Sequence, residues 1–154
     1  MEVTVKEMTM VTPCEETPRT SLWLSNNDLA VTAYHVSIVY FYKSNGSRDF
    51  FDTKVLREAL SKVLVSFYPY AGRLGYDKNG RIEIVCNAEG VLFGEAETSS
   101  VMDDFVQDFS DGSKVPQLVP KFDKLCCYFF LSASRFTGDY FQMRRSFYRS
   151  YFAP

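Results

Sequence analysis

The chain has 154 residues, of which 46% are hydrophobic and 23% are charged, and its formal net charge is −2 with a pI near 5.4. This length and composition predict one globular domain with a hydrophobic core. The charge excludes an overall basic field of the kind that draws a protein to nucleic acid or to anionic lipid, so no nucleic-acid partner is expected.

The N-terminal residues Met1 to Met10 contain no long apolar segment of the kind found in signal peptides. No apolar run approaches the ~20 residues of a membrane-spanning helix. The four cysteines, Cys14, Cys86, Cys126 and Cys127, form no C-x-x-C pair, and there is only one histidine. We therefore expect a cytoplasmic protein with free thiols, no metal site and no transmembrane segment.

In chain order, the alternation of Val3 to Val5 predicts a half-buried strand whose pattern shifts phase near Glu7. The proline-containing stretch from Thr12 to Thr20 predicts a surface connection. Ser25 to Asp28 is a cluster of capping and turn residues. The β-branched and aromatic run from Val36 to Tyr42 predicts a buried strand, because it ends at turn residues.

The clearest helix is predicted from Thr53 to Ser66. Asp52 is a candidate N-cap, and Pro69 prevents the helix from continuing, since proline has no backbone N–H. The predicted apolar face comprises Val55, Leu56, Ala59, Leu60, Val63 and Leu64, and the polar face Lys54, Arg57, Glu58, Ser61 and Lys62.

The turn Asp77-Lys78-Asn79-Gly80 predicts a hairpin, because Asn-Gly tolerates the positive φ angles of tight turns. A further strand is expected from Val91 to Phe93 and a helical turn from Val101 to Phe105. The order of these elements predicts an α/β or α+β layer in which a mixed sheet is covered by packing helices.

One segment of this chain, Tyr68-Pro69-Tyr70-Ala71-Gly72-Arg73-Leu74, resembles the Y-P-x-A-G-R-L segment of the plant BAHD acyltransferases. Neighbouring matches include Tyr40-Phe41-Tyr42, Gly80-Arg81-Ile82-Glu83-Ile84 and Gly90-Val91-Leu92-Phe93. Within that family, the likeness is strongest to the shikimate or quinate hydroxycinnamoyltransferases. The resemblance runs from Met1 to about Asp123. It implies that residues 1–124 are an incomplete N-terminal domain of a two-domain fold of the chloramphenicol-acetyltransferase type.

The resemblance also implies transfer of an acyl group, with acyl-CoA as the donor co-substrate and no bound cofactor, to a hydroxyl or amine acceptor. In the family, the histidine of an H-x-x-x-D-G motif removes the acceptor's proton, which an alcohol requires before it becomes a good nucleophile. Here the residue four positions after His35 is Val39, and neither this motif nor the family's D-F-G-W-G motif occurs. We assign no catalytic residue and expect no activity from this chain alone. The alternative is a non-catalytic protein that binds acyl-CoA or a partner.

By the same resemblance, His35 and Tyr40 are substrate-binding residues that line a pocket, although His35 is also explained as an ordinary histidine at a strand end. Ile38 stands where relatives carry a small hydroxyl residue, and would alter the preference of an acyl pocket. Arg73 could hold a phosphate of CoA, but its neighbours favour a packing role. The acidic group Asp103, Asp104 and Asp108 is interpreted as a solvated face.

The segment 125–154 differs in composition: ten of its 30 residues are aromatic, and it has four arginines and one acidic residue. We interpret it as a divergent tail, and the preferred hypothesis is a truncated or altered reading of the gene. Two alternatives remain. One is an amphipathic helix that makes weak contact with a membrane surface or acidic partner, with Phe141, Phe147, Tyr148, Tyr151 and Phe152 near one face and Arg144, Arg145 and Arg149 between them. The other is ordinary packing on the sheet.

Overall fold

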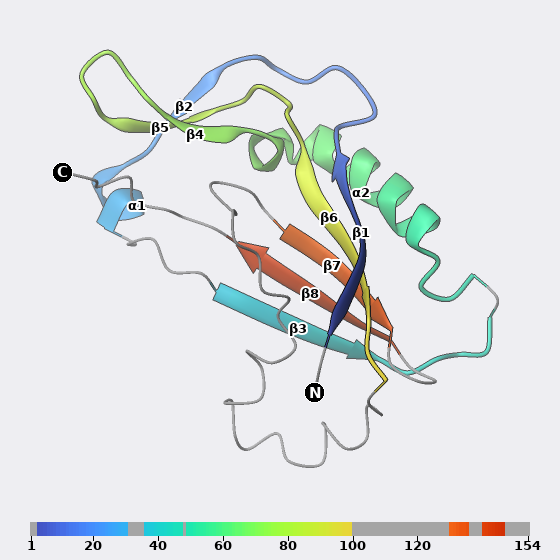
Figure 1. The fold of residues 1–154 in the computed structure, drawn as a ribbon. Coiled ribbons are helices and arrows are strands. Elements are labelled where there is room, and N and C mark those ends of the chain that lie inside the picture. The colour runs from blue at the N-terminus through green and yellow to red at the C-terminus, as the bar shows by residue number, and fades with distance from the viewer. Residues whose placement is uncertain (1–2, 31–35, 48, 100–129, 136–139, 147–154) are drawn as a thin grey trace.

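The computed structural model describes residues 3–30, 36–47, 49–99, 130–135 and 140–146 (Figure 1). Strands dominate this part of the chain. The elements are β1 (Thr4–Val11), β2 (Ser21–Trp23), α1 (Asn26–Ala30), β3 (Val36–Tyr42), α2 (Thr53–Ser66), the 3₁₀ helix η1 (Tyr68–Ala71), β4 (Arg73–Tyr76), β5 (Ile82–Val85), β6 (Val91–Glu97), β7 (Phe130–Arg135) and β8 (Tyr140–Ser146).

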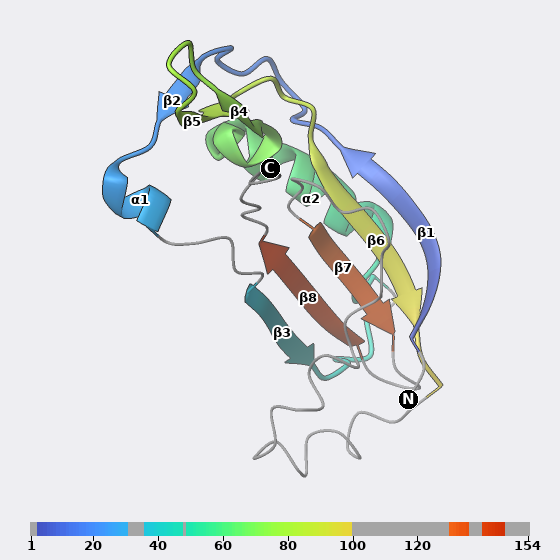
Figure 2. The same cartoon turned by 60° about the vertical axis from the view of Figure 1, so that its left-hand side comes forward.

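The strands form two sheets. The larger has the order β1-β6-β7-β8-β3, and the smaller has the order β2-β5-β4. All neighbours are antiparallel except β6 and β7, which are parallel. Figures 1 and 2 show the small sheet beyond one end of the large sheet, with α2 and η1 leading into it. The predicted mixed sheet with a packing helix is confirmed.

β1 pairs with β6 and contains the irregularity that its sequence predicted. The register shifts between Val5 and Glu7, because Val5 lies opposite Ala96 whereas Glu7 lies opposite Glu95. A β-bulge of this kind inserts one residue and reverses the face on which later side chains lie. The phase shift near Glu7 is therefore the sequence signature of this bulge.

The bounds of α2 agree with the prediction, and so does its N-cap. The Asp52 carboxylate accepts hydrogen bonds from the backbone N–H groups of Lys54 and Val55 at 2.8 and 3.1 Å. The helix ends at Ser66, and Pro69 lies in the first turn of η1, where its missing N–H costs nothing.

The predicted division of α2 into two faces needs a correction. Leu56, Leu60 and Leu64 pack on the core as expected. Arg57, however, is turned toward the sheet rather than toward solvent, whereas Val55 and Val63 are 53% and 51% exposed. The hydrophobic pattern alone missed this because polar groups on the sheet edge also attract one flank of the helix.

The core lies where α2 and η1 meet β1 and β6. Its most buried members are Phe93 at 1% exposure and Ala71 at 0%. Val11, Leu64 and Val91 complete the cluster. Residues far apart in sequence thus meet between one helix and two neighbouring strands, the arrangement expected of a helix packed on a sheet.

The predicted hairpin is formed by β4 and β5. Asp77 closes its turn, because its Oδ1 accepts hydrogen bonds from the N–H groups of Asn79 and Arg81 at 2.7 and 2.8 Å. The hydrogen bond from the Arg81 backbone, together with those from Asn79 and the nearby Arg81 charge, lowers the pKa of Asp77 below its usual value. A capped turn therefore fixes the register of this hairpin.

Arg81 also connects the hairpin to β2 and α1. Its guanidinium donates to the carbonyl oxygen of Leu24 at 2.7 Å and to Asn26 Oδ1 at 2.8 Å, and lies 4.7 Å from the ring centroid of Trp23. α1 itself begins at the predicted capping cluster. There the Ser25 N–H donates to Asp28 Oδ2 and the Asp28 N–H donates to Ser25 Oγ. Hydrogen bonds from the Ser25 side chain and backbone to the Asp28 carboxylate lower the pKa of Asp28.

β3 has the predicted bounds but is not a buried strand. In the described sheet it lies at one end of the strand order and pairs only with β8, and Tyr40 and Tyr42 are 50% and 39% exposed. An aromatic run fits a half-exposed strand as well as a buried one, because an aromatic ring can pack by one side alone.

The tail contributes two strands to the larger sheet. β7 pairs with β6 and β8, and β8 pairs with β3. The amphipathic-helix alternative is therefore wrong for Tyr140–Ser146, and Arg144 and Arg145 fall on opposite faces of a strand rather than near one helical face. Residues 147–154, and the helical turn expected from Val101 to Phe105, lie outside the described residues.

Candidate substrate-binding face

Two of the three predicted substrate-binding residues lie in β3. Ile38 and Tyr40 are separated by one residue, so the alternation of a strand places both on the same face. The Tyr40 side chain is half exposed. His35 lies outside the described residues.

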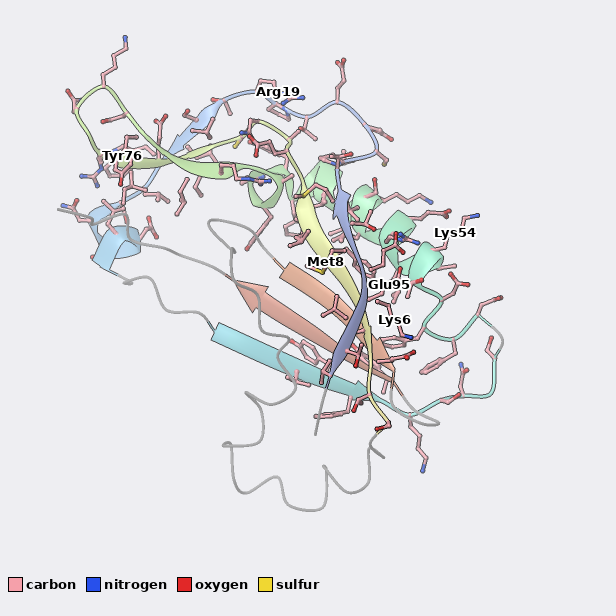
Figure 3. The ribbon with its side chains drawn as sticks, in the orientation of Figure 1. Lys6, Met8, Arg19, Lys54, Tyr76 and Glu95 are labelled. Carbon is pink, nitrogen blue, oxygen red and sulfur yellow. The ribbon has the colours of Figure 1, made fainter. Side chains whose placement is uncertain are left out.

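Strand register shows which face carries Tyr40. Directly opposed residues of neighbouring strands share a face, and Tyr40 lies opposite Gln142, which lies opposite Ala133, which lies opposite Glu95. Glu95 pairs with Arg57 of α2, with 3.4 Å between the charged groups. Tyr40 is therefore on the face of the sheet that α2 covers, and Figure 3 shows Glu95 between β6 and that helix.

Aromatic groups gather where this face meets the start of α2. The rings of Tyr42 and Phe51 have centroids 5.1 Å apart, and those of Phe50 and Phe51 are 5.4 Å apart. Tyr42 is two residues after Tyr40 and so shares its face. This arrangement offers apolar ring surface and a phenol hydroxyl, groups suited to holding an aromatic acyl chain.

Two acidic groups on this face, Glu7 and Glu95, share one cation. Arg57 lies 3.7 Å from Glu7 and 3.4 Å from Glu95, and it also donates to Thr9 Oγ1 at 3.3 Å. These contacts tie α2 to β1 and β6 across the sheet face. The role they show for Arg57 is to hold the helix on the sheet.

The residues of the Tyr68–Leu74 motif make structural contacts within the fold. An added Cβ at Gly72 would lie 2.4 Å from the carbonyl oxygen of Val85, so only glycine fits where η1 passes into β4. Arg73 Nε lies 2.9 Å from Glu89 Oε2, and Arg73 Nη1 donates to the carbonyl oxygens of Gly72 and Gly90 at 2.7 and 2.9 Å. These contacts support the packing role of Arg73 over a role in holding phosphate.

Neither metal-binding nor membrane-spanning features occur among the described residues. No group of three or more His, Cys, Asp or Glu side chains there could hold a metal ion, and no described helix is long and apolar enough to cross a bilayer. Cys14 and Cys86 are free thiols, and burial raises the pKa of Cys86. Asp103, Asp104 and Asp108 lie outside the described ranges.

Known structures share this fold. The crystal structure of vinorine synthase superposes with a TM-score of 0.66 at 21% sequence identity, covering 95% of this chain and 38% of that one. The uncovered 5% is about eight residues, fewer than the 30 residues from 125 to 154. The similarity in fold therefore extends into the tail, where β7 and β8 lie.

Sequence comparison defines the family. A protein-family model described as the Transferase family matches residues 1–125. The shikimate O-hydroxycinnamoyltransferase of Nicotiana tabacum is 56% identical over 123 residues, and the rosmarinate synthase of Plectranthus scutellarioides is 49% identical over 124 residues. Each match covers 80% of this chain and 28% of the relative.

The chain belongs to this transferase family, the BAHD acyltransferases, and the predicted resemblance is confirmed. Other relatives have names that agree, including a hydroxycinnamoyltransferase of Narcissus pseudonarcissus at 51% identity over 122 residues. The chain spans less than a third of the length of these relatives.

Proposed function

We propose that this chain forms part of the N-terminal sheet-and-helix domain of an acyl-CoA-dependent acyltransferase that transfers a hydroxycinnamoyl-type group to a hydroxyl or amine acceptor. The observation that carries this proposal is the family match over residues 1–125, together with relatives named for that transfer. In this proposal residues 1–124 supply the family scaffold, and residues 125–154 are a divergent tail.

The face of β3 would contribute one wall of the acyl pocket. Tyr40 is half exposed, Ile38 shares its face, and Tyr42 on the same face contacts the ring of Phe51, which supports the proposed role of Ile38 and Tyr40. His35 is assigned to this wall by family resemblance. An apolar Ile38 in place of a small hydroxyl residue would favour an acyl group with fewer polar substituents near that position.

By itself, the chain would not catalyse transfer. Its one histidine is followed four residues later by Val39, so the sequence lacks the general base that the family uses, and no other residue is assigned to that role. Purified protein mixed with hydroxycinnamoyl-CoA and shikimate should form no ester above background. The Nicotiana tabacum relative, assayed in parallel, is the positive control. Ester formation that depends on this chain would contradict the proposal.

A chimaera tests whether the scaffold is competent. The matching 123-residue segment of the Nicotiana tabacum relative is replaced by the corresponding segment of this chain. The chimaera should form ester, because the replaced segment would carry scaffold and pocket wall rather than the base. A second chimaera with Ile38→Ser should change the relative kcat/KM for acyl donors that differ in ring substitution. An inactive but folded first chimaera would refute the scaffold role.

The alternative function is binding without catalysis, and the half-exposed Tyr40 beside the α2 face favours it. Titration calorimetry with an acyl-CoA would then show saturable binding that Tyr40→Ala weakens. Tyr76→Ala is a matched control, because Tyr76 is 52% exposed but belongs to the smaller sheet. Equal loss in both variants would show that binding does not use the β3 face.

A further inference from the structure

Two Asn-Gly dipeptides lie in exposed connections of this chain. Asn45-Gly46 lies between β3 and α2, and Asn79-Gly80 lies in the turn between β4 and β5. Both asparagines are exposed, and both glycines have a φ of 77° with nothing within 4 Å of an added Cβ. Because glycine has no side chain beside its own nitrogen, that nitrogen can approach the preceding asparagine amide. The two dipeptides therefore share their chemistry and exposure, and they differ in their hydrogen bonds.

The hydrogen bonds around Asn45 favour addition to its side-chain amide. Asn45 Oδ1 accepts a hydrogen bond from the Ser47 N–H at 2.9 Å. A donor at this oxygen stabilises the negative charge that builds there when a nucleophile adds to the amide carbon. The Gly46 N–H donates to Ser44 Oγ at 3.2 Å, a long bond in an exposed connection. Because water can replace this acceptor, the Gly46 nitrogen is released at little cost.

The hydrogen bonds around Asn79 hold its turn closed. The Gly80 N–H donates to the carbonyl oxygen of Asp77 at 3.0 Å, and the Asp77 N–H donates to the carbonyl oxygen of Arg81 at 2.8 Å. The Asp77 carboxylate also accepts hydrogen bonds from the backbone and the side chain of Asn79. Addition of the Gly80 nitrogen to the Asn79 amide would break the first of these bonds and build negative charge beside this carboxylate. Both effects raise the barrier at Asn79.

We propose that Asn45 is a site of spontaneous deamidation, and that the folded chain reacts there in preference to Asn79. The Gly46 nitrogen forms a bond to Asn45 Cγ and loses its proton to solvent. The side-chain Cγ–N bond breaks, and the amide nitrogen takes up a proton and leaves as ammonia. Water then opens the resulting succinimide at either carbonyl, which gives aspartate or isoaspartate. The overall reaction is a hydrolysis without oxidation or reduction, and the inference does not depend on the proposed function.

The product changes the connection between β3 and α2. Either product adds a negative charge there, and isoaspartate also lengthens the main chain, because the chain then continues through the side-chain carbonyl. This connection leads from Tyr42, which shares a strand face with Tyr40, to the N-cap residue Asp52. Deamidation would therefore alter the charge and the length of the segment that joins the candidate substrate-binding face to α2.

The test measures deamidation of the purified 154-residue chain in mildly alkaline buffer. Ion-exchange chromatography separates the more acidic product, and peptide mass mapping locates the changed residue. In the folded chain Asn45 should convert about tenfold faster than Asn79, the ratio that roughly one additional hydrogen bond in the barrier would give. In concentrated urea both dipeptides lose their folded contacts, so the two rates should become similar.

Three substitutions separate the two sites. Asn45→Gln should remove the early acidic product, because glutamine would have to close a larger and less favourable ring. Asn79→Gln is the matched control and should leave that product unchanged. Asp77→Ala should accelerate conversion of Asn79, because it removes the carboxylate that accepts the hydrogen bonds of the turn.

Four outcomes would overturn the inference. Asn79 could convert as fast as Asn45 in the folded chain. The early acidic product could persist in Asn45→Gln, which would place the reaction elsewhere. The preference for Asn45 could be equally large in urea, which would assign it to the neighbouring sequence rather than to the fold. Asp77→Ala could leave the rate at Asn79 unchanged, which would show that the closed turn does not protect it. All four are read without turnover, so they are independent of whether the chain has acyltransferase activity.

Discussion

Residues 3–99 and the strands β7 and β8 both contribute to the larger sheet, but they differ in their similarity to the family. The first region matches the family in sequence and contains the described core, whereas β7 and β8 lie beyond the family match and still occupy interior positions of the sheet order. Sheet pairing uses backbone groups that every non-proline residue carries. A strand position therefore requires little of the sequence, whereas a catalytic motif requires particular side chains at a fixed spacing.

The strongest test of this comparison deletes residues 125–154. Removal of β7 and β8 would leave β3 without its partner and separate it from β6. We expect a loss comparable to the whole free energy of unfolding, about 5–15 kcal/mol for a domain. Urea unfolding followed by circular dichroism measures it. Unchanged cooperative unfolding of the shortened chain would show that the tail strands do not support the sheet.

Within the first region, Leu64→Ala tests the core. Leu64 is 3% exposed, so the substitution should lower the free energy of unfolding by about 2–5 kcal/mol through lost burial and a cavity. Val63→Ala is the control. The Val63 side chain, next to Leu64 in the helix, is 51% exposed, so its truncation should lower the free energy of unfolding much less. Chemical denaturation of both variants gives the comparison, and equal losses would contradict the helix rotation described above.

Gly72→Ala tests the family motif as a structural element. The added methyl group would lie 2.4 Å from a backbone oxygen, so the chain must shift, at an expected cost of about 1–3 kcal/mol. Gly75→Ala is the matched variant, because its new Cβ would meet only the Val85 side chain, at 2.7 Å, which can move. In thermal melts, the melting temperature of Gly72→Ala should be lower than that of Gly75→Ala. The reverse order would show that the η1–β4 passage tolerates a side chain.

The smallest expected effect is the acid dependence of the β4–β5 hairpin. Because the folded pKa of Asp77 is lowered, its contribution is present above the ordinary carboxyl pKa of about 3.9 and is lost as the pH falls through the folded value. Asp77→Asn should flatten this part of the stability curve while leaving the turn able to form. Urea midpoints measured at neutral pH and below about pH 4 test it. A curve that matches the wild type would exclude Asp77 as its source.

Sequence reasoning predicted most of the regular structure correctly. Helix α2 with its cap, the bounds of strand β3, the hairpin and the phase shift near Glu7 follow from local patterns, because capping, turn chemistry and side-chain alternation act over a few residues. β1 and β6 proved longer than predicted. Polar residues within both strands weakened the alternation on which the prediction was based. The two strands pair with each other along their whole length, and this pairing extends both beyond their apolar residues.

The candidate site was less predictable than the fold. Ile38 and Tyr40 fall on one face as a strand requires, but their place at the sheet edge depends on β8, which the tail composition did not indicate. The pairing of Arg57 with Glu7 and Glu95 was also missed. Ion pairs across tens of residues leave no periodic signal in either segment.

By itself, the sequence determined the family, the absence of an H-x-x-x-D-G motif and the local elements, since each is encoded by neighbouring residues at fixed spacings. Only the tertiary structure decided which flank of α2 meets the sheet, that Tyr40 remains half exposed, and that the tail pairs as strands. The physical reason is that these properties depend on contacts between distant segments. The same helix pattern could have been buried with either flank inward, and polar contacts with the β1 edge selected one of them.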